Sequence, residues 1–208
     1  DTPTKAMPSS GNPAASTVEG FPDLAPTDAN VQTLRAIYLG LATEVDDHLG
    51  RIIGHLKERG LYDRTLIVVT ADHGEMLGDH HAWGKSTFYD AAYHTALVIR
   101  DPDAPLRGGA VDLPTEAVDV TPTILDCLGL DIPHTMDGRS LRPFLSGEIP
   151  PDWRRNSFSE LDFGDPVTPT LAQEALGLPA EAANLAILRG PTHTAGPSSP
   201  EGSGPSAC

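Results

Sequence analysis

Side chains that could bind a cation or an anion follow one apolar segment of the chain. Residues 65–70 read Thr-Leu-Ile-Val-Val-Thr, and Asp72, His73, His80 and Lys85 come soon after them. A continuous run of apolar and β-branched residues is typical of a strand that is buried on both faces. Because ligands of open α/β sheets bind at the carboxyl ends of strands, we expect any chemistry to be centred on these side chains.

Asp72 and His73 could both face one cation. A carboxylate oxygen and an imidazole nitrogen are metal ligands, and Gly74 allows the backbone to leave strand geometry after them. In the alternative interpretation Asp72 caps a helix and His73 is solvated, and the spacing alone does not decide between the two. Calcium takes about six to eight oxygen ligands, and manganese or magnesium also needs more than two groups. Further ligands would therefore have to come from elsewhere in the fold.

The other basic side chains of this segment allow more than one interpretation. His80 and His81 are adjacent, but neighbouring side chains of an extended segment point to opposite sides, and the His-Glu-x-x-His zinc signature is absent. Lys85 could offset the charge of a bound anion, although a lone lysine is more often an ordinary surface residue. The sequence contains no Gly-x-Ser-x-Gly elbow, Walker loop or dinucleotide glycine fingerprint.

The composition argues against several classes of partner and site. The 208 residues carry a formal net charge of −15, which repels nucleic acid and anionic lipid, so we expect neither nucleic acid nor a membrane as a partner. Cys127 and Cys208 are the only cysteines, which argues against a disulfide framework and a cysteine-based zinc site. No apolar run approaches the ~20 residues that cross a bilayer.

A long helix and several shorter elements are predicted around this strand. Apolar residues recur every three or four positions from Val31 to Leu56, with Thr27 as a candidate N-cap and Gly60 as a left-handed stop. We also expect a strand over 95–100, a helix over 118–128, a turn and short helix over 136–147, and peripheral strands over 156–161 and 184–189. With residues 65–70 buried, this order predicts an α/β fold whose parallel or mixed sheet lies between helices.

Four segments share their order and spacing with a known family. They are the helix over 34–50; Thr-Ala-Asp-His-Gly-Glu over 70–75, followed by Gly-Asp-His over 78–80 and Gly-Lys over 84–85; Asp-Val-Thr-Pro-Thr-Ile-Leu-Asp over 119–126; and Met-Asp-Gly-Arg-Ser-Leu over 136–141. On these segments the chain resembles the sulfatase family of the alkaline phosphatase superfamily, and most of all its branch of phosphonate monoester hydrolases and related phosphodiesterases. The resemblance implies an alkaline-phosphatase-like α/β fold with a mixed, mostly parallel sheet flanked by helices, represented by its C-terminal portion.

The resemblance and the composition together predict a division of the chain. Residues 1–27 are expected to be a loop or linker, and residues 28–150 the C-terminal part of a sulfatase-like domain. Residues 151–189 are expected to be a peripheral subdomain. Residues 190–208 are rich in Pro, Gly and Ser, and we expect disorder there because such a segment buries too little apolar surface to offset its ordering entropy.

Carried over residue by residue, the resemblance implies roles for the side chains after the strand. It implies that Asp72 and His73 are metal ligands, and that Lys85 contacts the sulfuryl or phosphoryl oxygens or the leaving oxygen. His80 matches a recurrent position of the same loop and is the less defined catalytic candidate. The implied cofactor is one divalent metal ion, manganese or calcium. The implied partner is a small-molecule sulfate or phosphonate/phosphate ester, and an oligomer is possible by the same resemblance.

The nucleophile of the family has no counterpart in this sequence. In the family it is a formylglycine, made from Cys or Ser of a Cys/Ser-x-Pro-x-Arg motif in the N-terminal half, and neither Cys127 nor Cys208 stands in such a motif. Thr95-Ala96 also stands where the family often has an apolar residue and proline. We therefore expect a fragment of a metal-dependent ester hydrolase, inactive alone. Two alternatives stay open: an inactive remnant or non-catalytic metal- or anion-binding module, and a phosphomutase or nucleotide phosphodiesterase that uses Ser or Thr.

Overall fold

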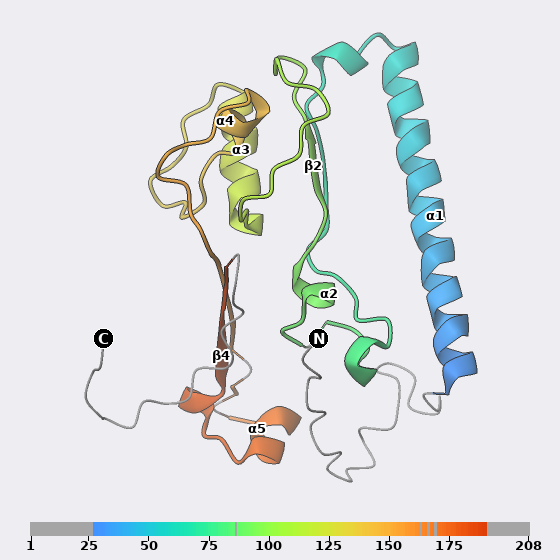
Figure 1. Ribbon diagram of the computed structural model, residues 1–208, viewed down its shortest axis with the longest axis vertical. Coiled ribbons are helices and arrows are strands. Elements are labelled where there is room, and N and C mark those ends of the chain that lie inside the picture. Colours follow the sequence, from blue (N-terminus) through green and yellow to red (C-terminus); the bar gives the residue numbers. More distant parts are fainter. Residues whose placement is uncertain (1–26, 86, 163, 166, 169, 191–208) are drawn as a thin grey trace, which may run out of the picture. The chain divides into compact units, whose positions relative to one another are not determined.

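The computed structural model describes residues 27–190, except residues 86, 163, 166 and 169. The chain forms two compact units, one that extends to Pro102 and one that starts at Asp103 (Figure 1). The predicted N-terminal loop and C-terminal tail fall outside the described residues, apart from their inner ends Thr27 and Gly190. The predicted division at residue 150 stays a prediction.

The first unit begins with the long helix α1, Asp28–Glu58 (Figure 1). Thr27 Oγ1 accepts a hydrogen bond from the Asn30 amide at 3.3 Å, and Gly60 has a φ of 65°, which confirms both predicted end signals. No residue of α1 is buried, and Val45 is 66% exposed. The apolar spacing therefore predicts the helix, but the described residues cover only part of its apolar face. No described helix is long and apolar enough to cross a membrane.

The strand before the candidate ligands pairs with one other strand. β1, Ile67–Thr70, runs antiparallel to β2, Leu97–Arg100, with Val68 opposite Ile99. Both strands lie where the sequence predicts them, but the expected burial on both faces is wrong: most of β1 is half-buried, and Val98 is 60% exposed. The reason is that this sheet has two strands among the described residues, and it is not joined to the other two-stranded sheet. Two strands are too few to bury both faces of β1.

An arginine fastens the start of β1 at the end away from the candidate ligands. The Arg100 guanidinium donates hydrogen bonds to the carbonyl of Tyr62 at 2.8 Å and to that of Thr65 at 3.1 Å. The same guanidinium lies 3.8 Å from the centre of the Tyr62 ring, a favourable cation–π distance. The short helix η2, Tyr62–Arg64, is thereby held against the end of β2.

The second unit combines short helices with a second antiparallel strand pair. Its elements are η4 Ala117–Asp119, α3 Val120–Cys127, α4 Arg142–Leu145, β3 Ser157–Asp162, α5 Leu171–Leu176, η5 Ala180–Ala182 and β4 Asn184–Arg189. β3 pairs with β4, and the register sets Ser157 opposite Arg189. The predicted helix over 118–128, the short helix after the turn at 136 and both peripheral strands are confirmed.

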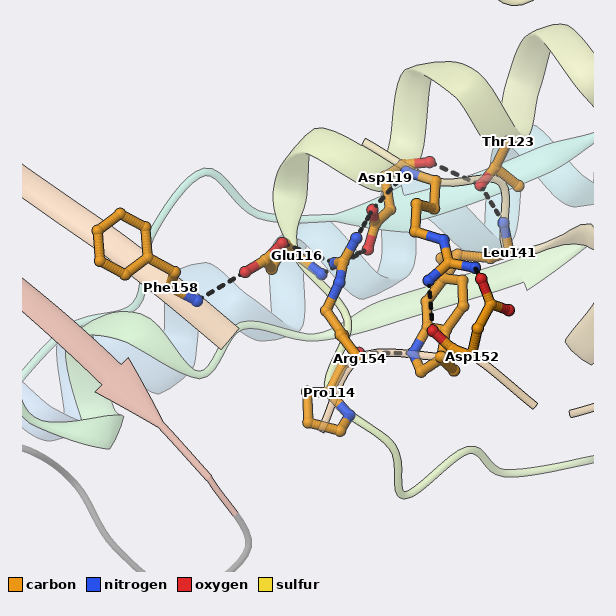
Figure 2. Close-up of polar contacts among 10 residues, drawn as sticks. Pro114, Glu116, Asp119, Thr123, Leu141, Asp152, Arg154 and Phe158 are labelled. Atoms are coloured by element: carbon orange, nitrogen blue, oxygen red, sulfur yellow. Dashed lines mark hydrogen bonds and ion pairs between the residues drawn. The ribbon is translucent and has the colours of Figure 1, made fainter. Parts of the chain in front are cut away.

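A buried carboxylate ties the segments of this unit together (Figure 2). Asp119 is 0% exposed, and its two oxygens accept hydrogen bonds from two nitrogens of Arg154 at 2.6 and 2.7 Å. The same oxygens accept from the amides of Glu116 and Arg139, each at 2.8 Å. Glu116 in turn accepts from the Phe158 amide in β3 at 2.6 Å. Because donors occupy both Asp119 oxygens, its charge is tolerated in the interior.

A hydroxyl and a glycine close the packing around α3. Thr123 Oγ1 donates to the Asp119 carbonyl at 2.6 Å and accepts from the Leu141 amide at 2.8 Å. A Cβ on Gly138 would lie 1.9 Å from the Val118 carbonyl oxygen. Only glycine therefore lets these two backbone segments approach each other so closely.

Candidate active site

The chain turns away from β1 at a glycine. The Gly74 amide donates to the Ala92 carbonyl of α2, Asp90–Tyr93, at 2.7 Å. A Cβ at this position would lie 1.9 Å from the Ala91 carbonyl oxygen, so any larger residue would push α2 away. The two candidate metal ligands stand just before this turn, at the carboxyl end of the strand.

The His73 ring is oriented by the backbone of its own segment. Its Nδ1 lies 2.8 Å from the Gly74 carbonyl oxygen, which can only accept, so Nδ1 carries the proton and donates. Nε2 is left with a lone pair, and the Asp72 Oδ2 lies 3.6 Å from it. A backbone carbonyl that fixes the tautomer in this way commonly stands behind metal-binding imidazoles.

Lys85 completes what we call the strand-end cluster: Asp72, His73 and Lys85. The Lys85 Nζ lies 2.8 Å from His73 Nε2. Because an ammonium can only donate, this contact requires a lone pair on Nε2 and agrees with the tautomer that the Gly74 carbonyl sets. The structure thus brings together three of the predicted site residues.

The donors of the cluster fit part of a divalent metal site. A carboxylate and a neutral imidazole suit manganese, whereas calcium would depend more on oxygen ligands. Within the described part of the chain, no group of three or more His, Cys, Asp or Glu side chains could hold a metal ion. Asp72 and His73 can therefore supply one side of a shell, as predicted, and the other ligands must come from elsewhere.

The loop that carries the lysine is held at both ends by Glu75. One carboxylate oxygen, Oε1, accepts from the Gly84 amide at 2.7 Å and from the Leu77 amide at 3.2 Å. Met76 is fully buried, and its amide donates to the Gly84 carbonyl at 2.9 Å. The residue that precedes the lysine therefore has both of its backbone polar groups bonded.

Leu77 has a strained backbone conformation in the same loop. Its φ of 49° lies in the left-handed region, which costs a residue with a Cβ roughly 1–2 kcal/mol. Its amide donates to Glu75, and its carbonyl accepts from Arg35 Nε of α1 at 2.7 Å. Another Arg35 nitrogen binds Asp79 Oδ1 at 2.9 Å. Bonds on both sides of Leu77 thus hold a conformation that the residue would otherwise avoid.

Neither Glu75 nor Arg35 is among the site residues predicted from the sequence. Glu75 belongs to the Thr-Ala-Asp-His-Gly-Glu segment, so its place beside two candidate ligands is a signal that could have identified it. Arg35 offers no comparable signal, because its partner Leu77 is distant in sequence and the contact exists only once the loop is folded.

His80 lies in the same loop but has a different partner. Its φ is 53°, and its ring stacks on that of Tyr89 with the centroids 3.7 Å apart and the planes 4° from parallel. Among the described residues, no hydrogen bond or ion pair joins His80 to the strand-end cluster. Its catalytic role stays a prediction. The side chain of His81 lies outside the described part of the structure.

Known proteins share both the sequence and the local structure. A family model described as sulfatase matches residues 6–130. The multifunctional alkaline phosphatase superfamily protein PehA of Trinickia caryophylli is 45% identical over 139 residues, which cover 66% of this chain and 27% of that protein. The chain therefore spans about a quarter of the length of this curated relative.

Two solved structures extend the similarity. The phosphonate monoester hydrolase from Silicibacter pomeroyi matches with a TM-score of 0.81 and 61% identity, over 88% of this chain and 37% of that one. The phosphonate monoester hydrolase of Agrobacterium radiobacter matches with a TM-score of 0.74 and 45% identity, over 81% of this chain and 33% of that one. These matches confirm the predicted alkaline-phosphatase-like α/β class, and the chain covers part of that fold. The chain belongs to the sulfatase family of the alkaline phosphatase superfamily.

Proposed function

We propose that this chain is part of a metal-dependent hydrolase that cleaves phosphonate, phosphate or sulfate esters. The observation that carries the proposal is the strand-end cluster, in which the ammonium lies 2.8 Å and the carboxylate 3.6 Å from one imidazole nitrogen. A fold alone does not define a substrate, so the chemistry of this cluster has to support the function. The 61% identity to a phosphonate monoester hydrolase makes phosphonate monoesters the first substrates to test.

Asp72 and His73 would hold the metal ion, the histidine through Nε2. Members of the family generally use a divalent metal and a formylglycine, and we propose manganese or calcium for this chain. When bound, such an ion polarises the ester oxygens and lowers the pKa of a nucleophile. The hydrogen bond from Nδ1 to the Gly74 carbonyl at 2.8 Å supports this role, because it keeps the lone pair on Nε2.

Lys85 would stabilise the negative charge that develops on the non-bridging or leaving oxygens. Its ammonium lies 2.8 Å from His73 Nε2; a metal ion that takes this lone pair would displace the ammonium from the imidazole, and the oxygens of a tetrahedral anion beside the metal could then accept from it. In a chain with a net charge of −15, an anionic substrate needs local positive charge of this kind.

A second candidate function is a non-catalytic metal- or anion-binding module. The observation that favours it is the absence of any Cys/Ser-x-Pro-x-Arg motif from the 208 residues, which leaves the cluster without the nucleophile of the family. The two candidates differ in a measurable property, because only a hydrolase turns over an ester once the rest of the site is supplied.

A chimeric enzyme tests the hydrolase. Residues 27–190 would replace the matching segment of the Silicibacter pomeroyi enzyme, and the chimera would be assayed with an aryl phosphonate monoester, an aryl phosphate diester and an aryl sulfate, with manganese or calcium added. We expect metal-dependent turnover that Asp72→Ala abolishes. Lys85→Ala should lower kcat roughly 10²–10³-fold, as is typical when one donor to a developing oxyanion is removed.

The matched control is Asp46→Ala, because Asp46 is an exposed carboxylate on α1. It should leave turnover unchanged. Equal turnover in the Asp72→Ala and Asp46→Ala chimeras would contradict the proposed site. A chimera that binds manganese but hydrolyses none of the three esters would favour the binding module instead.

A further inference from the structure

Two side chains outside the strand-end cluster shape the loop that carries Lys85. Glu75 lies inside the loop, where its Oε1 binds the amides of Leu77 and Gly84. Arg35 reaches the loop from α1 and binds the Leu77 carbonyl. We call these two residues the Glu75–Arg35 clamp. Together they bond both backbone groups of a residue whose φ is 49°, and strain of this kind concentrates at functional sites.

We propose that Glu75 is a positioning residue, which holds Gly84 so that the adjacent Lys85 ammonium reaches His73 Nε2. The inference rests on the proposed function, since it names what sets the geometry of the same cluster. Arg35 supports the far side of the loop. Neither residue of the clamp touches the candidate metal ligands through any bond found among the described residues, so each acts through the backbone.

The path from Glu75 to the lysine is short. Gly84 has a φ of 71°, and its amide and carbonyl are bonded to Glu75 Oε1 and to the Met76 amide. Met76 is fully buried, so this side of the loop is anchored in the interior of the unit. On the other side, the Lys85 carbonyl accepts from the Thr87 amide at 2.7 Å. With the backbone fixed before and after Lys85, only its side-chain torsions remain to direct Nζ.

Three substitutions of Glu75 separate the parts of this arrangement. Glu75→Gln keeps an oxygen acceptor in the same place but removes the charge, which weakens the bonds without deleting them. Glu75→Asp keeps the charge but is one methylene shorter, so one oxygen can no longer reach both amides. Glu75→Ala removes both bonds. The positioning role predicts that the lysine contact is kept in the first variant and lost in the other two.

The test follows nuclear magnetic resonance signals of the full 208-residue chain at one fixed pH. In Glu75→Ala, hydrogen exchange of the Gly84 and Leu77 amides should become roughly ten-fold faster or more, because a bond to a charged acceptor is lost. The amides of β1 and β2 should keep their protection. The His73 ring signals should move to the positions that they have in Lys85→Ala, since both variants lose the same contact.

Rescue by Glu75→Gln distinguishes positioning from a general effect on stability. That variant should keep the His73 ring signals of the wild type. The matched control is Glu58→Ala, which removes an exposed glutamate at the end of α1 and should leave both the exchange rates and the His73 signals unchanged.

His73 ring signals that stay wild-type in Glu75→Ala would overturn the inference, and so would a Glu75→Gln chain that behaves like Lys85→Ala. If Glu75→Ala does not fold, the His73 ring signals of Glu75→Asp decide the question. Signals at the positions found in Lys85→Ala support the inference, and signals at the wild-type positions overturn it. Because no turnover is measured, failure of this inference and failure of the hydrolase are separate results.

Discussion

Two groups of carboxylates and cations, one in each unit, have opposite relations to solvent. Asp119 in the second unit is 0% exposed and receives hydrogen bonds from Arg154 and from two backbone amides. Asp72 in the strand-end cluster is 87% exposed and, among the described residues, accepts a hydrogen bond only from the His73 amide. An ionised carboxylate offers about four lone-pair positions. Asp119 has none left for a ligand, whereas Asp72 has most of its own.

The sequence signal does not separate these two carboxylates, because both stand in segments that resemble the family. Each also depends on a glycine that lets two backbones approach: Gly138 near the first and Gly74 near the second. What separates them is burial and the number of donors. A buried carboxylate with a full set of donors stabilises the fold, and an exposed one with lone pairs to spare is available to a cation.

The largest expected effect is on the buried group. Arg154→Ala removes the guanidinium partner of Asp119, whose side chain is 0% exposed, and breaking a buried pair in this way costs roughly 3–5 kcal/mol. The free energy of unfolding would be measured by urea titration, followed by the fluorescence of Trp153 in a Trp83→Phe background. Removal of the exposed neighbour Arg155 is the control and should cost less than about 0.5 kcal/mol. A loss below about 1 kcal/mol for Arg154→Ala would mean that the network is no more than a surface ion pair.

The next effect concerns the glycine beside the strand-end cluster. In Gly74→Ala the new Cβ would meet the Ala91 carbonyl oxygen at 1.9 Å, so the backbone has to move, at a cost of roughly 1–3 kcal/mol. Gly40 in α1 has nothing within 4 Å of such a Cβ, and Gly40→Ala should instead stabilise the chain by about 0.5–1 kcal/mol, because alanine favours the helix. Thermal unfolding of the two variants measures the contrast. Equal effects of the same sign would show that the contact of Gly74 with α2 does not constrain the fold.

Local signals predict much of the fold. α1 follows from the spacing of its apolar residues and from Thr27 and Gly60 at its ends, and β1 and β2 follow from short runs of apolar and β-branched residues. The antiparallel pairing of β1 with β2 does not follow, because a strand's own residues do not specify its partner. The wrong expectation that β1 is buried on both faces has a similar cause. Apolar side chains show that a strand can be buried, but not which segments cover it, and the described residues cover β1 only in part.

For the candidate site, too, the sequence predicts some residues and misses others. The identities of Asp72, His73 and Lys85 are accessible from the sequence because they lie close together in one motif. The arginines that bind the loop of the strand-end cluster and the buried Asp119 are harder to predict from the sequence. Arg35 acts on a loop far along the chain, and Arg154 meets Asp119 across a long sequence separation. Nothing local distinguishes such arginines from solvated ones, so only the folded structure identifies them.

A third carboxylate lies between the two extremes and gives a smaller, pH-dependent effect. The hydrogen bond from the Ser140 hydroxyl, and then the Arg142 guanidinium, hold the pKa of Asp126 below its ordinary value of 3.8, against an opposing effect of partial burial. Its side chain is 31% exposed, so solvent screening limits the contribution to at most about 1 kcal/mol. Because the pKa is lowered on folding, this stability is present above the ordinary value and is lost as the pH falls through the folded pKa.

As the pH falls below about 5, Asp126→Asn should therefore lose less unfolding free energy than the wild type does. Asp131→Asn, an exposed carboxylate in the same unit, should leave the wild-type slope. A carbon NMR titration checks the cause, since Ser140→Ala should raise the pKa of Asp126 towards its ordinary value. A pKa unchanged by Ser140→Ala would show that the hydroxyl is not the main cause.

The smallest effect on stability should come from the strand-end cluster itself. Asp72→Ala and Lys85→Ala remove exposed side chains, and each should change the free energy of unfolding by less than about 0.5 kcal/mol. The same Asp72→Ala chain should bind manganese more weakly than the wild type in a calorimetric titration, because one of the two proposed protein ligands is gone. Arg154→Ala reverses this pattern, with a large loss of stability and no direct effect on manganese binding in the first unit. If Asp72→Ala destabilised the chain as strongly as Arg154→Ala, Asp72 would be a structural residue like Asp119, and exposure would not distinguish the two roles.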